Sequence, residues 1–129
     1  MYLGIDVGTS GVKVVLTNDG NNIIASETSK LNVMRPKHGW SEQDPNDWWH
    51  ATNKAIDNIK NQFSNHLKQV QGIGLSGQMH GLTALDASDQ PLRPSILWND
   101  TRSFEEAKYL DETEPLFRSI GGNVVMPVS

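Results

Sequence analysis

The residues best suited to chemistry stand at the start of the chain, in the run Gly4-Ile5-Asp6-Val7-Gly8-Thr9-Ser10-Gly11-Val12-Lys13. Two apolar segments flank a short turn of glycines and hydroxyl residues, as in a β-hairpin. Such a turn offers backbone N–H groups and hydroxyl donors to an anion, and the neighbouring carboxylate of Asp6 could hold a metal ion. These residues predict a site for nucleotide phosphates and Mg²⁺. The structural alternative is an ordinary hairpin whose glycines only make the turn.

The spacing of the glycines excludes two common phosphate-binding motifs. Gly4, Gly8 and Gly11 do not form the Gly-x-Gly-x-x-Gly pattern that opens a helix in dinucleotide-binding proteins. A P-loop requires Gly-Lys-Ser/Thr followed by a helix, whereas Lys13 is followed by the β-branched pair Val14-Val15. A phosphate bound here would therefore lie against a β-hairpin rather than a helix N-terminus.

Three strands and a loop are expected to position this turn; they cover Tyr2–Val7, Val12–Thr17 and Ile23–Thr28, and then Leu31–Gln43. A helix follows, because Asp44 is a good N-cap and Pro45 suits the first helical position. Its apolar stripe has spacings of three and four and should cover the sheet; it consists of Trp48, Thr52, Ala55, Ile56, Ile59 and Phe63.

After this helix, Val70–Ser76 is predicted to be a buried strand parallel to a neighbour, since a helix separates it from the earlier strands. Its carboxyl end leads into the polar loop Gly77–Gly81, at the edge where open α/β sheets bind ligands. Leu82–Leu85 and Ser95–Trp98 are expected to form an added hairpin. Two helices follow it. The first carries Phe104, Ala107 and Leu110 on its inward face, and the second covers Glu114–Ile120.

Composition narrows the class of protein. The 129 residues carry a formal charge of −4 without a Lys/Arg cluster, which argues against nucleic-acid binding. The chain has no cysteine, and its four histidines lack the spacing of zinc ligands. It has no signal-peptide pattern and no run long enough to cross a membrane, so a cytoplasmic protein without membrane partners is expected.

The element order βββαβ, with a phosphate-binding turn between the first two strands, resembles one lobe of the actin-like (ribonuclease H-like) ATPase fold, an α/β class. Four stretches together resemble the FGGY carbohydrate kinases, and most closely those that act on xylulose. They are Gly4–Lys13, Gly39-Trp40-Ser41-Glu42-Gln43-Asp44-Pro45, Gly74-Leu75-Ser76-Gly77-Gln78-Met79-His80-Gly81 and Ile96-Leu97-Trp98-Asn99-Asp100-Thr101-Arg102. The third discriminates best, because glycerol kinases carry Arg-Glu where Met79-His80 stand.

This resemblance implies a role for each candidate residue. Asp6 would be catalytic, acting through Mg²⁺ and the phosphates, and the phosphate-binding set would be Gly8, Thr9, Ser10, Gly11 and Lys13. The sugar-binding set would be Gln78, Met79, His80, Trp98, Asn99 and Asp100. Two readings of Asp100 stay open beside this one, since it could pair with Arg102 or cap the helix that follows.

The resemblance also implies an activity, the ATP-dependent phosphorylation of D-xylulose to D-xylulose 5-phosphate. Residues 1–129 would form the N-terminal portion of the first lobe, with the general base beyond Ser129 and the adenine-binding lobe absent. The chain alone is then expected to be inactive, and its exposed interlobe face to favour a homodimer. The alternatives are an FGGY kinase for ribulose, fuculose, gluconate or glycerol, and an actin-like nucleotide-binding module without sugar chemistry.

Overall fold

The structure, a computed structural model, describes residues 1–127. These residues divide into two compact units. The first contains Met1–Val33 and Asp44–Gln78, and the second contains Met34–Gln43 together with the residues from Met79 onward. The segment of ten residues from Met34 therefore leaves the first unit and the chain returns to it at Asp44.

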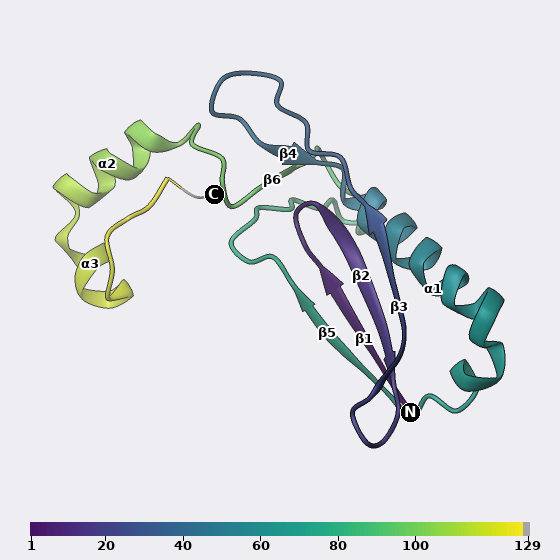
Figure 1. Ribbon diagram of the computed structural model, residues 1–129. Coiled ribbons are helices and arrows are strands. Elements are labelled where there is room, and N and C mark those ends of the chain that lie inside the picture. Colours follow the sequence, from purple (N-terminus) through teal and green to yellow (C-terminus); the bar gives the residue numbers. More distant parts are fainter. Residues whose placement is uncertain (128–129) are drawn as a thin grey trace. The chain divides into compact units, whose positions relative to one another are not determined.

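A mixed sheet forms one layer of the first unit. Its strands lie in the order β3-β2-β1-β5, and their bounds are Tyr2–Val7 for β1, Gly11–Thr17 for β2, Ile23–Lys30 for β3 and Gly72–Gly77 for β5 (Figure 1). β2 pairs antiparallel with both β1 and β3, whereas β5 pairs parallel with β1. The predicted order of three antiparallel strands, a crossover helix and a parallel strand is confirmed.

Helix α1 (Pro45–Leu67) forms the second layer and packs mainly on β2 and β3. It begins as expected, because the Asp44 carboxylate accepts a hydrogen bond of 2.9 Å from the backbone N–H of Asn46. Between the two layers lies the apolar core of this unit, formed by Leu3, Ile5, Val12, Val14, Leu16, Ala51, Ala55 and Ile59. The stripe predicted from the sequence supplies the last two of these residues and the buried Thr52.

Strand β5 is exposed, and the prediction of a buried strand was wrong. Ile73 and Leu75 stand in register with the buried Leu3 and Ile5 of β1, yet their exposed fractions are 62% and 80%. The cause is their place at the edge of the sheet, because α1 covers β2 and β3 and no further strand pairs with β5 within residues 1–127. An apolar sequence therefore gives a buried strand only where another element covers that strand.

The second unit contains two short strands, β4 (Glu42–Gln43) and β6 (Ser95–Ile96), and two helices, α2 (Phe104–Thr113) and α3 (Pro115–Gly121). β6 is central to it, since β4 pairs with one side and Leu82 bridges the other. The sequence placed Glu42 and Gln43 in a loop, because two residues are too few to show a strand pattern. In α2 the expected inward face is only partly correct, since Ala107 is buried but Phe104 is 53% exposed.

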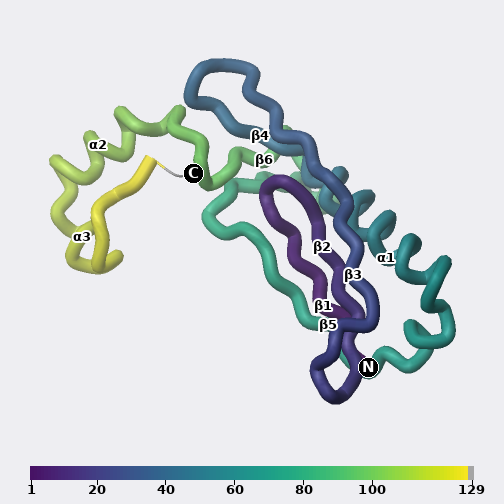
Figure 2. The backbone as a smooth tube through the Cα atoms, viewed as in Figure 1, coloured from purple at the N-terminus to yellow at the C-terminus, as the bar shows by residue number. Residues whose placement is uncertain are grey.

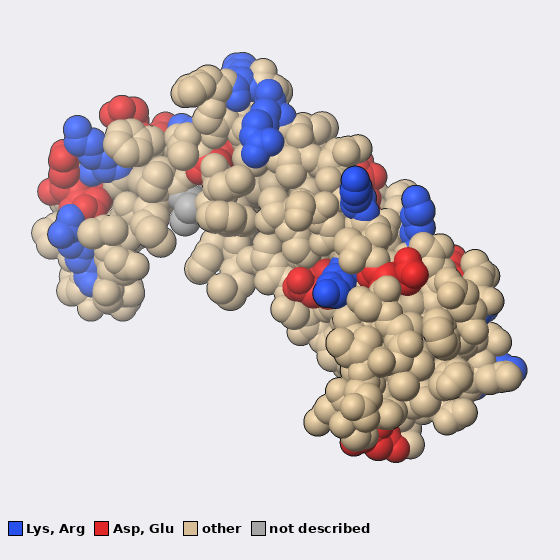
Figure 3. Space-filling view, in the orientation of Figure 1, with Lys and Arg blue, Asp and Glu red and all other residues tan. Residues whose placement is uncertain are grey.

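The surface carries charges of both signs. On the face shown in Figure 3, Lys and Arg are scattered and several stand next to Asp or Glu. Within residues 1–127, none of the helices has the length and apolar character needed to cross a membrane.

Candidate functional site

The predicted phosphate turn is the tip of the β1–β2 hairpin, drawn in purple in Figure 2. Thr9 and Ser10 form the tip, and the backbone N–H of Gly8 donates to the carbonyl of Gly11 at 3.1 Å. The end of β3 supports the tip, since the N–H of Leu31 donates to the Ser10 carbonyl at 3.1 Å. A Cβ atom at Gly11 would lie 2.9 Å from the Ser29 carbonyl oxygen, so the close approach of β3 requires glycine there.

Asp6 and Lys13 lie opposite each other on β1 and β2, and Ser76 lies opposite Asp6 on β5. All three line a hollow of about 330 Å³ in the first unit. The strand alternation places them on the sheet face away from α1, because Ile5 and Val12 beside them are core residues. A carboxylate, an ammonium group and a hydroxyl thus share one exposed surface next to the hairpin.

The donor set at Asp6 fits a magnesium ion held mostly by water and phosphate oxygens. Its side chain is exposed, and within residues 1–127 it accepts no hydrogen bond and forms no ion pair. No three acidic, histidine or cysteine side chains gather as ligands in the described part of the chain. A single free carboxylate is what Mg²⁺ commonly takes from a protein when a nucleotide supplies further oxygens.

Gln78 links the end of β5 to the hairpin tip. Its side-chain oxygen accepts a hydrogen bond of 3.1 Å from the Thr9 hydroxyl, and its backbone N–H donates to the Val7 carbonyl at 3.0 Å. One residue predicted to bind sugar therefore contacts one predicted to bind phosphate. The other predicted sugar residues belong to the second unit.

In that unit, the Met79-His80 loop and the Trp98-Asn99 segment leave the same end of a strand pair. Leu82 and Ile96 exchange backbone hydrogen bonds of 2.8 and 3.0 Å in an antiparallel bridge. Because the pair is antiparallel, the loop that precedes Leu82 and the segment that follows Ile96 lie at the same end of it. Met79 and His80 are both exposed, and His80 has a φ of 64°, a left-handed conformation that is uncommon outside glycine but that histidine adopts more often than most residues.

Trp98 and Asn99 are the two central residues of a tight turn. The backbone N–H of Asp100 closes the turn by donating to the carbonyl of Leu97 at 3.0 Å. Leu97 is fully buried, and its own N–H donates to the carbonyl of Ser41 at 2.9 Å. The Trp98 side chain is 47% exposed, so the turn presents its indole at the surface of the second unit.

The Asp100 carboxylate is buried beneath this turn, with only 1% of its side chain exposed. Its Oδ2 accepts from the backbone N–H of Ser41 at 2.6 Å, and Oδ1 accepts from the backbone N–H of Arg102 at 2.8 Å. Two side-chain nitrogens of Arg102 complete the set, with Nε 2.8 Å from Oδ1 and Nη2 2.7 Å from Oδ2. Burial raises the pKa of Asp100, but the hydrogen bonds from Arg102 and Ser41 more than offset it and lower the pKa to about 2.

Arg102 contacts further side chains through Nη2 and one face of its guanidinium, while its buried Nη1 has no hydrogen-bond partner among the described residues. Its Nη2 lies 2.8 Å from Glu42 Oε1, which also contacts Arg93 Nη2 at 2.7 Å. The guanidinium carbon stands 3.7 Å from the centroid of the Trp40 ring. Sequence reasoning considered the pairing of Asp100 with Arg102 but missed the parts of Glu42 and Trp40. Trp40 and Glu42 lie about sixty positions before Arg102 in the chain, so only the tertiary structure brings the three together.

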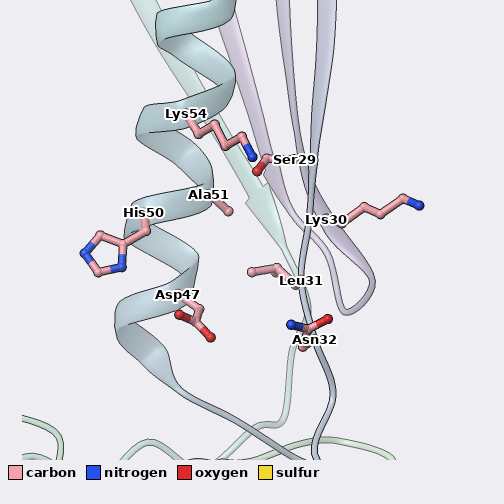
Figure 4. A pocket seen from close by; sticks show the side chains of 8 residues that line it. All are labelled: Ser29, Lys30, Leu31, Asn32, Asp47, His50, Ala51 and Lys54. Atoms are coloured by element: carbon pink, nitrogen blue, oxygen red, sulfur yellow. The ribbon is translucent and has the colours of Figure 1, made fainter.

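A second hollow in the first unit, of about 220 Å³, lies between the end of β3 and the first turns of α1 (Figure 4). Figure 4 shows the Lys54 side chain pointing toward Ser29, whereas the His50 ring points away from Ser29. None of the residues predicted to bind phosphate or sugar lines this hollow.

Comparison with known proteins places this arrangement in a family. The model of the FGGY family of carbohydrate kinases, N-terminal domain, matches residues 1–129. The chain belongs to the FGGY family of carbohydrate kinases. It is 50% identical over 127 residues to the xylulose kinase of Escherichia coli strain K12, a match that covers 98% of this chain and 26% of that protein.

Solved FGGY structures resemble the chain over the same span. A xyloylose kinase from Brucella ovis superposes with a TM-score of 0.94 at 52% identity, covering 98% of this chain and 26% of that one. A xylulose kinase from Rhodospirillum rubrum gives a TM-score of 0.89 at 26% identity with the same coverage. The chain therefore spans about a quarter of the length of the relatives it matches.

Proposed function

We propose that this chain contributes the phosphate-binding hairpin and part of the sugar-binding surface of an ATP-dependent xylulose kinase. The reaction would transfer the γ-phosphate of ATP to D-xylulose and release D-xylulose 5-phosphate. The observation that carries the proposal is the identity of about half of the residues to proteins named as xylulose kinases, across 98% of the chain. More distant family members, such as a gluconate kinase at 26% identity, support the fold and leave the sugar to be tested.

The hairpin tip would bind the transferred phosphates. Gly8 and Gly11 would bring the backbone close to the ligand, and Ser10 would supply a hydroxyl donor. The Thr9 hydroxyl donates to Gln78 and would donate to a phosphate only after leaving that partner. Lys13 lies on the same sheet face as Asp6 and would balance the negative charge of the phosphates. Mg²⁺, when bound with ATP, supplies further charge neutralisation, and Asp6 would hold it through water. Phosphoryl transfer depends chiefly on such alignment and charge stabilisation.

The sugar would contact the surface formed by the Met79-His80 loop and the Trp98-Asn99 turn. His80 could hydrogen-bond a hydroxyl, and Met79 and Trp98 offer apolar walls. The side-chain oxygen of Asn99 is buried, so only its amide nitrogen would be left to contact the sugar. Gln78 would contribute to sugar binding from the first unit, where its side-chain oxygen accepts a hydrogen bond of 3.1 Å from the Thr9 hydroxyl. Asp100 would support the turn instead of binding sugar directly, because both of its oxygens already accept hydrogen bonds from protein groups.

We assign no general base within residues 1–129, although a sugar hydroxyl that attacks phosphorus needs one. The chain alone is therefore proposed to have no kinase turnover. The experiment that tests the function replaces the matching segment of the E. coli xylulose kinase with this chain and measures ATP-dependent phosphorylation. D-xylulose, ribulose, gluconate and glycerol serve as parallel substrates.

Preference of the chimera for D-xylulose, lost on Asp6→Ala, would support the proposal. A folded chimera that prefers another sugar would replace xylulose but keep the kinase. A folded chimera that hydrolyses ATP without phosphorylating any of the four compounds would refute the kinase function itself.

A further inference from the structure

The turn that we propose contacts the sugar is fixed from one side by a group of charged and aromatic residues. We call this group the Arg102 cluster; it consists of Trp40, Glu42, Arg93, Asp100 and Arg102. Its two carboxylates and two guanidinium groups balance in charge. Neither acidic side chain is more than 8% exposed, so both depend on these cations and on backbone donors.

The cluster meets the Trp98-Asn99 turn at Asp100. This residue closes the Trp98-Asn99 turn with its backbone N–H and anchors it with its carboxylate. Arg102 provides three of the four hydrogen bonds to that carboxylate, one from its backbone and two from its side chain. The position of Trp98 therefore depends on the orientation of the guanidinium group, although Arg102 itself is separated from the turn by Asp100.

We propose that Arg102 is a positioning residue for sugar binding, which acts through Asp100 to set the Trp98-Asn99 turn. This proposal rests on the proposed function, since it gives the turn a sugar to bind. Carboxylate oxygens of Asp100 and Glu42 contact the nitrogens of the guanidinium, and the Trp40 ring stacks against one of its faces. Its planar shape is what allows all of these contacts at once.

A lysine at this position would keep the charge but lose the geometry. An ammonium group cannot present two parallel N–H groups to the two oxygens of Asp100, and it cannot lie flat on Trp40. Arg102→Lys therefore keeps a positive charge beside the buried Asp100 carboxylate but removes the contacts that place the turn. The chain offers a matched control in Arg118, which makes an equivalent two-nitrogen contact to Asp111 in the same unit.

The test compares Arg102→Lys with Arg118→Lys in the chimeric kinase. Arg102→Lys should raise KM for D-xylulose about ten-fold while KM for ATP stays within about two-fold of its original value. Arg118→Lys should change neither constant. Glu42→Gln gives a second variant that weakens the hold on Arg102 without touching Asp100, and we expect a smaller rise in the same constant.

Amide hydrogen exchange in the 129-residue chain gives a readout that needs no activity. In Arg102→Lys, the N–H groups of Ser41 and Asp100 should exchange faster, whereas that of Leu82 should keep its protection. Equal changes in both substrates' KM values, or unchanged exchange at Ser41 and Asp100, would overturn the positioning role while leaving the kinase function in place. A folded parent chimera without activity on xylulose would instead overturn the proposed function, and this role with it.

Discussion

Replacement of Asp100 by asparagine removes the charge from the centre of the Arg102 cluster with almost no change in size. The carboxylate accepts four hydrogen bonds, all from protein N–H groups, at 2.6 to 2.8 Å. In Asp100→Asn, one oxygen becomes an NH₂ group that points at donors. We expect the second unit to lose about 3 kcal/mol of stability at pH 7, in the range typical for breaking a buried ion pair.

The pKa of Asp100 indicates the size of the pH-dependent part of this loss. Burial raises this pKa, but the hydrogen bonds from Arg102 and Ser41 lower it by more than burial raises it. The net result is a fall from 3.8 to about 2. At about 1.4 kcal/mol for each pKa unit, this difference contributes about 2 to 3 kcal/mol to the stability of the folded state. Because the folded pKa is the lower one, the contribution is complete above about pH 5 and is lost as the pH falls through 2.

The assay is denaturant unfolding of the 129-residue chain, followed by tryptophan fluorescence at pH 7, 3 and 2. Trp48→Phe and Trp49→Phe in the background leave Trp40 and Trp98, so the signal reports the second unit. The stability difference between the parent and Asp100→Asn should narrow by about 1 kcal/mol at pH 3 and by about 2 kcal/mol at pH 2.

Asp57→Asn, an exposed position on α1, serves as the control and should change stability by less than about 0.5 kcal/mol. A loss of less than about 1 kcal/mol for Asp100→Asn at pH 7 would contradict the role of the buried charge. A parallel loss of stability in both proteins as the pH falls would also contradict it, because the titration would then belong to other carboxylates.

Three further substitutions probe the phosphate turn and the sugar loop. Asp6→Ala should lower turnover of the chimera at least about 100-fold in steady-state kinetics. Because the side chain is exposed, denaturant unfolding should show a change in stability of less than about 0.5 kcal/mol. Retained turnover would remove Asp6 from the mechanism. His80→Gly should raise KM for D-xylulose while leaving stability unchanged or higher by about 1 kcal/mol, since glycine relieves the φ of 64°; a loss of stability with unchanged KM would assign His80 to the fold alone. Gly11→Ala should cost about 1 to 3 kcal/mol in denaturant unfolding, because its Cβ would meet the Ser29 carbonyl at 2.9 Å. Gly74→Ala, with no atom within 4 Å of the added Cβ, is its control, and equal losses at the two glycines would contradict the close approach at Gly11.

Local patterns in the sequence were sufficient for much of the first unit. The β1–β2 hairpin follows from alternation around a glycine-rich turn, and the start of α1 follows from Asp44 and Pro45. These features depend on residues within a few positions of each other, so composition and spacing reveal them. The residues of the phosphate turn could be named in the same way, and their contact with ATP stays a prediction.

What depends on distant parts of the chain could not be derived from local pattern. Strand β5 has the composition of a buried strand and is exposed, because burial is decided by whether another element covers it. Two residues, Glu42 and Gln43, pair with β6 more than fifty positions away and become buried polar groups.

The same reason applies to the candidate sugar site. The sequence by itself determined which side chains could bind a sugar, since Met79, His80 and Trp98 stand in recognisable stretches. Only the tertiary structure decided that His80 and Trp98 leave one end of a strand pair and that Asp100 lies buried under Arg102. Pairing register and charge compensation join residues far apart in the chain, so their energy is set by the folded arrangement and not by any local pattern.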